Sequence, residues 1–156
     1  MKKLKLYLDT SVFNFALSDR VGDENAKLTT EILLQKIKQG IYEGYISERI
    51  MVEIGKAPEA KRLALLNLIN GIPMESLVID EETRVLADRY VAEGLIPVKY
   101  DDDALHIAVA TTNELDMIVS WNFEHMIKRK TKHGVIGVNE LLGYKAIEII
   151  TPLEVD

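Results

Sequence analysis

The apolar and polar positions of the chain fall into two alternating patterns, short apolar runs and longer stretches with helical spacing. The short runs predict β-strands at residues 4–8, 41–47, 77–79, 117–120 and 147–150. The longer stretches predict helices over residues 24–39, 59–70 and 81–93, with shorter helices after Asp9, after Ser47, near residues 122–129 and within residues 134–143. Strands that alternate with helices predict an α/β fold, a three-layer α/β/α sandwich with a central parallel sheet.

Single residues mark the beginnings of several predicted helices. Thr10 or Ser11 is expected to cap the helix after Asp9, and Ser47 is expected to cap the next short helix. The run Asp101–Asp103 opens a helix that is apolar on nearly every side. Such a helix is expected to pack on more than one face.

The chain has 156 residues, about the length of one domain, and neither a linker nor a repeat interrupts it. We therefore expect a single domain over residues 1–156. The chain contains no cysteine, so any metal ion must be held by oxygen or imidazole ligands. No apolar stretch reaches the roughly 18 residues of a membrane span. These features fit a cytoplasmic protein without a membrane partner.

The formal net charge of −6 argues against charge-driven wrapping of nucleic acid over a broad surface. It does not exclude a nuclease, because a bound metal ion and a local basic patch can supply positive potential at one site. The densest basic run is Lys128-Arg129-Lys130-Thr131-Lys132-His133. This run is either a solvated helix end or a rim that faces phosphate groups.

Three acidic residues are expected at one edge of the predicted sheet. Asp9 directly follows the first strand, Glu53 lies in the helix after the second strand, and Asp103 begins the apolar helix. In open α/β sheets, ligands bind outside the carboxyl ends of the strands. Three carboxylates that meet there repel each other unless a cation lies between them, and Mg²⁺ prefers oxygen ligands. A bound metal ion activates water and stabilises charge on phosphate, so the expected reaction is phosphodiester hydrolysis.

Each candidate also has a plainer interpretation. Asp9 can be only a turn or cap residue, Glu53 a solvated helix residue, and the run Asp101–Asp103 favourable charge at a helix N-terminus. Trp121 is either a core aromatic or a platform on which a base stacks. His106 is either a hydrogen-bonded packing residue or a residue that ligates the metal ion or steers a phosphate. The candidates for contact with the acids, with water or with substrate are Ser11, Asp102, His106, Ser120 and Asn122.

Four blocks of residues carry a resemblance to a known family. They are Leu6-Tyr7-Leu8-Asp9-Thr10-Ser11-Val12-Phe13, Ile46-Ser47 with Glu53-Ile54, Asp103-Ala104-Leu105-His106-Ile107-Ala108-Val109-Ala110, and Ile118-Val119-Ser120-Trp121-Asn122-Phe123-Glu124-His125. In order and spacing, over about the first 140 residues, these blocks resemble the PIN-domain family. This is the nuclease fold of the VapC-type toxins of prokaryotic toxin–antitoxin modules.

The resemblance implies a parallel sheet, a Mg²⁺ or Mn²⁺ cofactor and single-stranded RNA as substrate. It places the catalytic acids at Asp9, Glu53 and Asp103, with Asp9 and Asp103 as metal ligands. Many family members have a fourth acid where this chain has Asn122, and the aspartate often found three residues later is His125 here. One metal ion is therefore expected, not two.

Three hypotheses about function follow. The first is a metal-dependent endoribonuclease, as in the toxin of a type II toxin–antitoxin pair, with a cognate antitoxin as partner and a homodimer as assembly. The second is a catalytically silent PIN-like module that binds RNA or protein, which the neutral Asn122 favours. The third is a phosphotransfer enzyme with Asp9 as nucleophile. Such enzymes usually need an acid two residues later, where this chain has Ser11.

Overall fold

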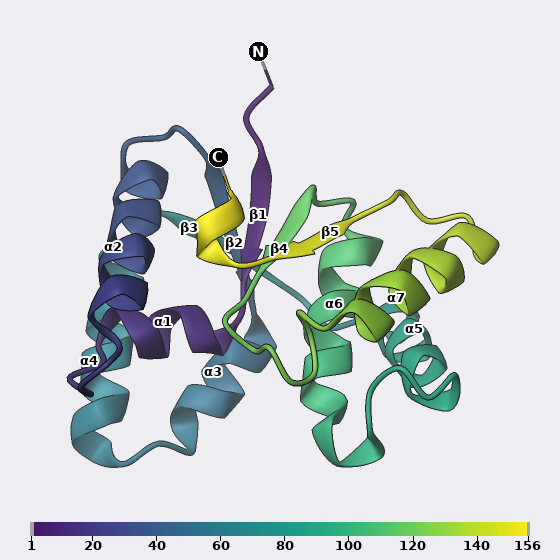
Figure 1. Ribbon diagram of the computed structural model, residues 1–156, viewed down its shortest axis with the longest axis horizontal. Coiled ribbons are helices and arrows are strands. Elements are labelled where there is room, and N and C mark those ends of the chain that lie inside the picture. Colours follow the sequence, from purple (N-terminus) through teal and green to yellow (C-terminus); the bar gives the residue numbers. More distant parts are fainter. Residues whose placement is uncertain (1, 156) are drawn as a thin grey trace.

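The computed structural model describes residues 2–155, which form a five-stranded parallel sheet with helices on both faces (Figure 1). The strands are β1 (Lys5–Leu8), β2 (Glu43–Ser47), β3 (Met74–Leu77), β4 (Met117–Val119) and β5 (Glu148–Ile150). The helices are α1 (Thr10–Ala16), α2 (Glu24–Lys38), α3 (Glu48–Gly55), α4 (Glu59–Asn70), α5 (Glu81–Ala92), α6 (Asp101–Thr112) and α7 (Arg129–Leu141), with 3₁₀ turns η1 (Val98–Tyr100) and η2 (Pro152–Glu154). The predicted three-layer α/β/α sandwich is confirmed.

The strand order in the sheet is β3-β2-β1-β4-β5, and every neighbouring pair is parallel. β1 is the central strand, where Tyr7 lies opposite Tyr45 on one side and Ile118 on the other. Its side chains alternate between two cores, as in a strand buried on both faces. Leu6 and Leu8 pack with helices α1 to α4, and Tyr7 packs with helices α5 to α7.

The chain reverses its path across the sheet at β1. It runs from β1 through β2 to β3 at one edge, and then returns to the other side of β1 to form β4 and β5. In open α/β sheets, ligands bind outside the carboxyl ends of the strands that flank such a reversal. Those strands are β1 and β4, and in Figure 1 the carboxyl end of β1 is the point where the chain enters α1.

Helix α6 is the most deeply buried helix of the described chain. Each of its residues from Ala104 to Thr111 is buried, so the prediction that it packs on more than one face is confirmed. The side chains from Ala104 to Ala110 are nearly all apolar and belong to the core that α5 and α7 share. No helix within residues 2–155 is both long and apolar enough to cross a bilayer.

The third strand begins earlier than the sequence predicts. β3 spans Met74–Leu77, so the predicted strand at residues 77–79 is wrong apart from its first residue. The amide of Ile79 donates a hydrogen bond to Oε1 of Glu48 at 2.7 Å and does not join the sheet. β3 is an edge strand whose two middle residues are exposed, which explains its weak apolar pattern.

The predicted helix near residues 122–129 is also wrong. In the described chain this segment forms turns and bends as far as Lys128. The backbone carbonyl of Asn122 accepts hydrogen bonds from the amides of Met126 at 3.2 Å and Ile127 at 2.9 Å. These bonds close a tight loop directly after β4, and the loop keeps Asn122 at the edge of the sheet.

Helix α7 is longer than the short helix predicted within residues 134–143, and it continues through Gly134 and Gly137. Glycine weakens a helix, so both positions resemble breaks in the sequence. At Gly134, a Cβ atom would lie 2.1 Å from Cδ2 of Leu95, so the close approach of Leu95 requires glycine there. At Gly137, a Cβ atom would meet no neighbouring group within 4 Å.

Alanine is expected to have opposite effects at the two glycines of α7. Gly137→Ala should raise the free energy of unfolding by about 0.5–1 kcal/mol, because alanine favours the helix and meets no neighbour. Gly134→Ala should lower it by about 1–3 kcal/mol, because the overpacked Leu95 must shift in the core. Urea denaturation measures both variants against the parent. A stabilising Gly134→Ala would show that Leu95 moves aside at little cost.

Candidate active site

Asp9 lies at the carboxyl end of β1 with 4% of its surface exposed, and it is itself the N-cap of α1. The prediction that Thr10 or Ser11 caps this helix is therefore wrong. Oδ1 of Asp9 accepts hydrogen bonds from the amide of Ser11 at 3.1 Å and from its hydroxyl at 2.5 Å. Oδ2 accepts a hydrogen bond from the hydroxyl of Ser120 at 2.6 Å. The two serines hold the carboxylate at the junction of β1 and β4.

Glu53 lies on α3, which begins directly after β2 with Ser47 as its cap, as predicted. Oε1 of Glu53 accepts a hydrogen bond from the hydroxyl of Thr10 at 3.1 Å. The same oxygen lies 2.5 Å from Nε2 of His106, and because a carboxylate only accepts, the imidazole is the donor. Burial opposes ionisation of Glu53, but the hydrogen bond and charge of His106 outweigh it and hold the pKa of Glu53 below its ordinary value.

A buried chain of hydrogen bonds extends from Glu53 into the core. Nδ1 of His106 lies 2.6 Å from the hydroxyl of Tyr7, and that hydroxyl lies 2.8 Å from the hydroxyl of Ser47. Tyr7, Ser47 and His106 are all buried. His106 is thus a hydrogen-bonded packing residue, as one of its two interpretations predicts, and it also contacts Glu53.

Asp103 lies in the first turn of α6, and its Oδ2 accepts a hydrogen bond from the side-chain amide of Asn122 at 3.1 Å. Burial raises the pKa of Asp103 to about 6, and the charges of Asp9 and Glu53 add to this increase against the opposing charge of His106. Burial likewise raises the pKa of Asp9, and the charge of Glu53 contributes to that shift too. The three predicted acids therefore lie near enough to disfavour each other's ionisation.

The donor set fits a single hard cation better than a closed metal cage. Within residues 2–155, no group of three or more Asp, Glu or His side chains is already arranged to hold a metal ion. Glu53 is bonded instead to His106 and Thr10. Mg²⁺ is usually held by only one or two carboxylates, with water and substrate phosphate as the remaining ligands. Asp9 and Asp103 supply such a pair. Burial raises the pKa of both carboxyl groups, and a nearby cation would favour their ionised forms.

The remaining predicted residues differ in whether they contact the acids. Asp102 forms an ion pair with Arg49 of α3, and the pair crosses from α6 to the helix that carries Glu53. Trp121 is buried and its Nε1 donates a hydrogen bond to the hydroxyl of Thr30 at 2.8 Å, so it is a core aromatic. Asn122 contacts Asp103 directly.

Several residues that touch the site were not predicted from the sequence. Tyr7 precedes Asp9 by two residues and was expected only as a strand residue, but its hydroxyl contacts His106. Thr10 follows Asp9 directly and was expected only as a cap residue, but its hydroxyl contacts Glu53. Arg49, whose charge helps to lower the pKa of Glu53, was also missed. Its position four residues before Glu53 places both on one face of α3, and that spacing was a usable signal.

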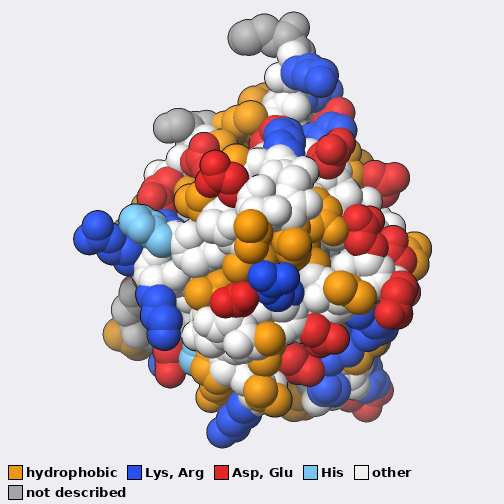
Figure 2. Space-filling model, turned by 90° about the vertical axis from the view of Figure 1, so that its right-hand side faces the viewer, with side chains coloured by type: hydrophobic (Ala, Val, Ile, Leu, Met, Phe, Trp, Pro, Cys, Tyr) orange, Lys and Arg blue, Asp and Glu red, His pale blue; other side chains and the backbone are white. Residues whose placement is uncertain are grey.

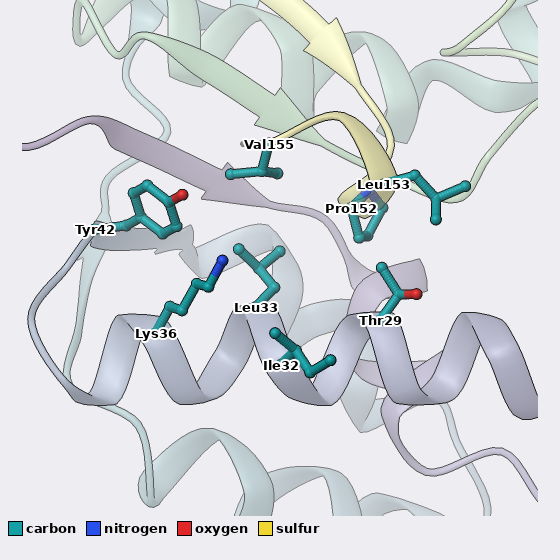
Figure 3. A pocket seen from close by; sticks show the side chains of 8 residues that line it. All are labelled: Thr29, Ile32, Leu33, Lys36, Tyr42, Pro152, Leu153 and Val155. Atoms are coloured by element: carbon teal, nitrogen blue, oxygen red, sulfur yellow. The ribbon is translucent and has the colours of Figure 1, made fainter.

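A separate pocket lies between α2 and the segment of η2 near the C-terminus (Figure 3). In Figure 3 the side chain of Leu33 points from α2 toward Val155 and Pro152. The pocket is lined by Thr29, Ile32, Leu33, Lys36, Tyr42, Pro152, Leu153 and Val155, so none of the predicted acids borders it. Tyr42 directly precedes β2, whereas the acids lie beyond the carboxyl ends of the strands. This pocket is therefore distinct from the acid cluster.

Asp103→Asn should stabilise the metal-free protein at neutral pH but not near pH 4. Burial raises the pKa of Asp103 to about 6, so the folded state favours the neutral carboxyl group. This group therefore does not lower the free energy of unfolding below its ordinary pKa, but it does so increasingly as pH rises through 6. Asparagine cannot ionise, so we expect a gain on the order of 2 kcal/mol at pH 7.

Thermal unfolding in EDTA at both pH values measures this effect. The control is Asp101→Asn, because Asp101 belongs to the same acidic run but is exposed, and it should change little at either pH. An equal gain from Asp103→Asn at both pH values would contradict the role of ionisation.

Comparison with known proteins supports the fold assignment. No protein-family model and no curated protein sequence matches the chain. A chain of the VapBC2 complex from Rickettsia felis, solved bound to a DNA fragment from its promoter, matches with a TM-score of 0.60 and 12% identity, over 95% of this chain and 98% of that chain. VapBC-5 from Mycobacterium tuberculosis, a member of the VapBC family of toxin–antitoxin systems, matches with a TM-score of 0.52 and 18% identity, over 94% and 98%. At these identities the likeness shows a shared fold, so the PIN-like architecture predicted from the motifs is confirmed.

Proposed function

We propose that this protein is a metal-dependent endoribonuclease that hydrolyses phosphodiester bonds of single-stranded RNA. The observation that carries this proposal is the pair of carboxylates Asp9 and Asp103, which come from β1 and α6 to the carboxyl edge of the sheet beside its reversal. Burial makes their joint ionisation costly, and a divalent cation removes that cost. The shared fold with chains of VapBC complexes supports the same class of activity.

Each residue of the site has a defined task in this proposal. Asp9 and Asp103 would hold one Mg²⁺ or Mn²⁺ ion, and Ser11 and Ser120 fix the orientation of Asp9. When bound, such an ion would supply water polarisation and charge stabilisation at the phosphate. Glu53 is ionised at neutral pH because its pKa is lowered, so it can accept a proton from the attacking water.

The neutral amide of Asn122 explains why one metal ion is proposed and not two. Its side-chain nitrogen donates to Oδ2 of Asp103 at 3.1 Å, and its side-chain oxygen accepts from the amide of His125 at 3.0 Å. Glu124, the nearest acid of that loop, has a side chain that is 81% exposed and lies 3.7 Å from His125. A second cation would therefore lack a carboxylate at this corner.

The proposed partners follow from the comparison. Because the matching chains belong to VapBC toxin–antitoxin complexes, we propose that this protein is the toxin of a type II pair with a cognate antitoxin. The predicted homodimer stays a prediction. On the side of the molecule that carries α5 and α7, apolar side chains lie among charged ones (Figure 2), and Val85 of α5 and Leu142, just after α7, line one pocket there.

A cleavage assay tests the proposed function directly. Purified protein should cut a fluorescent single-stranded RNA when Mg²⁺ or Mn²⁺ is present, and EDTA should stop the reaction until excess metal is restored. Duplex RNA of the same sequence serves as the matched substrate and should be cut much more slowly. Cleavage that continues in EDTA would contradict the metal-dependent assignment.

A further inference from the structure

We propose that three neighbouring segments form an RNA track beside the acid cluster: η1, the loop of residues 121–128, and the first turn of α7. This inference rests on the proposed substrate, single-stranded RNA, and specifies where the strand lies. Trp121, the platform suggested by the sequence, cannot stack on a base because it is buried and bonded to Thr30. Two other aromatic rings are exposed in its place.

Phe123 and Tyr100 are the exposed aromatic rings of the track. Phe123 is 58% exposed, and its ring centroid lies 6.3 Å from that of the buried Trp121 at an angle of 49°, so the ring contacts the core while more than half of its surface stays exposed. Tyr100 is 38% exposed, and its ring stacks on that of His125 with centroids 4.0 Å apart. Supported aromatic rings of this kind are platforms for the unpaired bases of single strands.

Hydrogen bonds place both rings next to the acids. Asn122 donates to Asp103 and accepts from the amide of His125, so it joins the loop to the start of α6. Tyr100 directly precedes α6, and Phe123 directly follows Asn122. Both rings therefore lie close to the contact between Asp103 and Asn122. A strand whose bases stack on them passes its phosphates along the proposed metal site.

Positive charge borders the same segments. The hydroxyl of Thr131 in α7 donates to the carbonyl of Leu95 at 3.3 Å, which holds the first turn of α7 beside the segment that leads into η1. Residues 128–130 are all basic and exposed, and Lys99 of η1 is exposed as well. Glu124 is the opposing charge of the loop. In a chain of net charge −6, lysine and arginine concentrated here suit a phosphate backbone, and the exposed rings beside them suit its unpaired bases.

RNA binding by the Asp9→Asn protein tests the track without cleavage. Anisotropy of a short fluorescent single-stranded RNA, measured in Mg²⁺, should show binding about tenfold weaker when Phe123→Ala is added, the size of one lost base stack. Phe123→Tyr keeps the ring and should restore binding. Leu141→Ala, which removes another exposed apolar side chain outside the track, should leave binding unchanged.

The possible outcomes separate this inference from the proposed function. Weaker binding with Phe123→Ala and recovery with Phe123→Tyr support the track, even if the wild-type protein fails to cut RNA and the nuclease assignment is lost. Unchanged RNA binding with Phe123→Ala overturns the track, while cleavage by the wild-type protein would still uphold the nuclease.

Discussion

Asp9→Asn is expected to reduce metal-dependent cleavage of single-stranded RNA by at least about a thousandfold, which corresponds to the several kcal/mol that a bound metal ion contributes to the transition state. Asp9 is the carboxylate that Ser11 and Ser120 hold at the end of β1, and asparagine fills the same volume without the charge. The fold should survive the change, because asparagine is also a favoured N-cap residue and its side-chain oxygen can still accept the hydrogen bonds from Ser11.

The matching variant on the other side of the site is Asp103→Asn, for which a loss of similar size is expected. Asp101→Asn is the control, since it neutralises an exposed acid of the same run and should leave activity within about twofold. Each protein is purified in parallel, so that a contaminating nuclease appears equally in all preparations. Full activity in both Asp9→Asn and Asp103→Asn would remove the basis of the proposed site.

His106→Asn is expected to lower kcat about a hundredfold, because it removes the hydrogen bond that holds Glu53. Asparagine places its amide near the position of Nδ1, so the contact to the hydroxyl of Tyr7 can persist. His106→Gln is the matched variant, because its amide reaches toward the position of Nε2 and can still donate to Glu53. We expect His106→Gln to retain activity within about tenfold of the parent.

Stability measurements distinguish this positioning role from a purely structural one. Both variants leave part of a buried hydrogen-bond chain unsatisfied, so each should lower the free energy of unfolding by about 1–3 kcal/mol. Only His106→Asn should combine that loss with the large decrease in kcat. If the two variants lose activity equally, the bond between His106 and Glu53 has no special part in the reaction.

The fold was largely predictable because its signals are local. The alternation of strands and helices, the apolar α6 and the cap Ser47 depend on neighbouring residues in the chain. The errors arose where particular contacts, and not the spacing of apolar residues, decide the structure. Gly134 resembles a helix break but is required by Leu95, and residues 122–129 resemble a helix but are closed into turns by the carbonyl of Asn122.

The sequence allowed the acids of the candidate site to be named, but not the residues that bond to the groups around them. Asp9, Glu53 and Asp103 follow strands or open a helix, so the rule for carboxyl ends of parallel strands brings them to one edge. The pairing of Asp102 with Arg49, and of His106 with Tyr7, depends on how α3, α6 and β1 pack. Spacing along the chain does not carry that information, since these partners lie 53 and 99 residues apart.

A calorimetric titration with Mn²⁺ tests the central claim most directly, because it measures the metal site without depending on the choice of RNA. The wild-type protein should bind one Mn²⁺ ion per chain, and the Asp9→Asn, Asp103→Asn double variant should bind none at the same concentrations. Failure of the wild-type protein to bind Mn²⁺, or equal binding by the double variant, would contradict the proposed metal site and favour a silent PIN-like module.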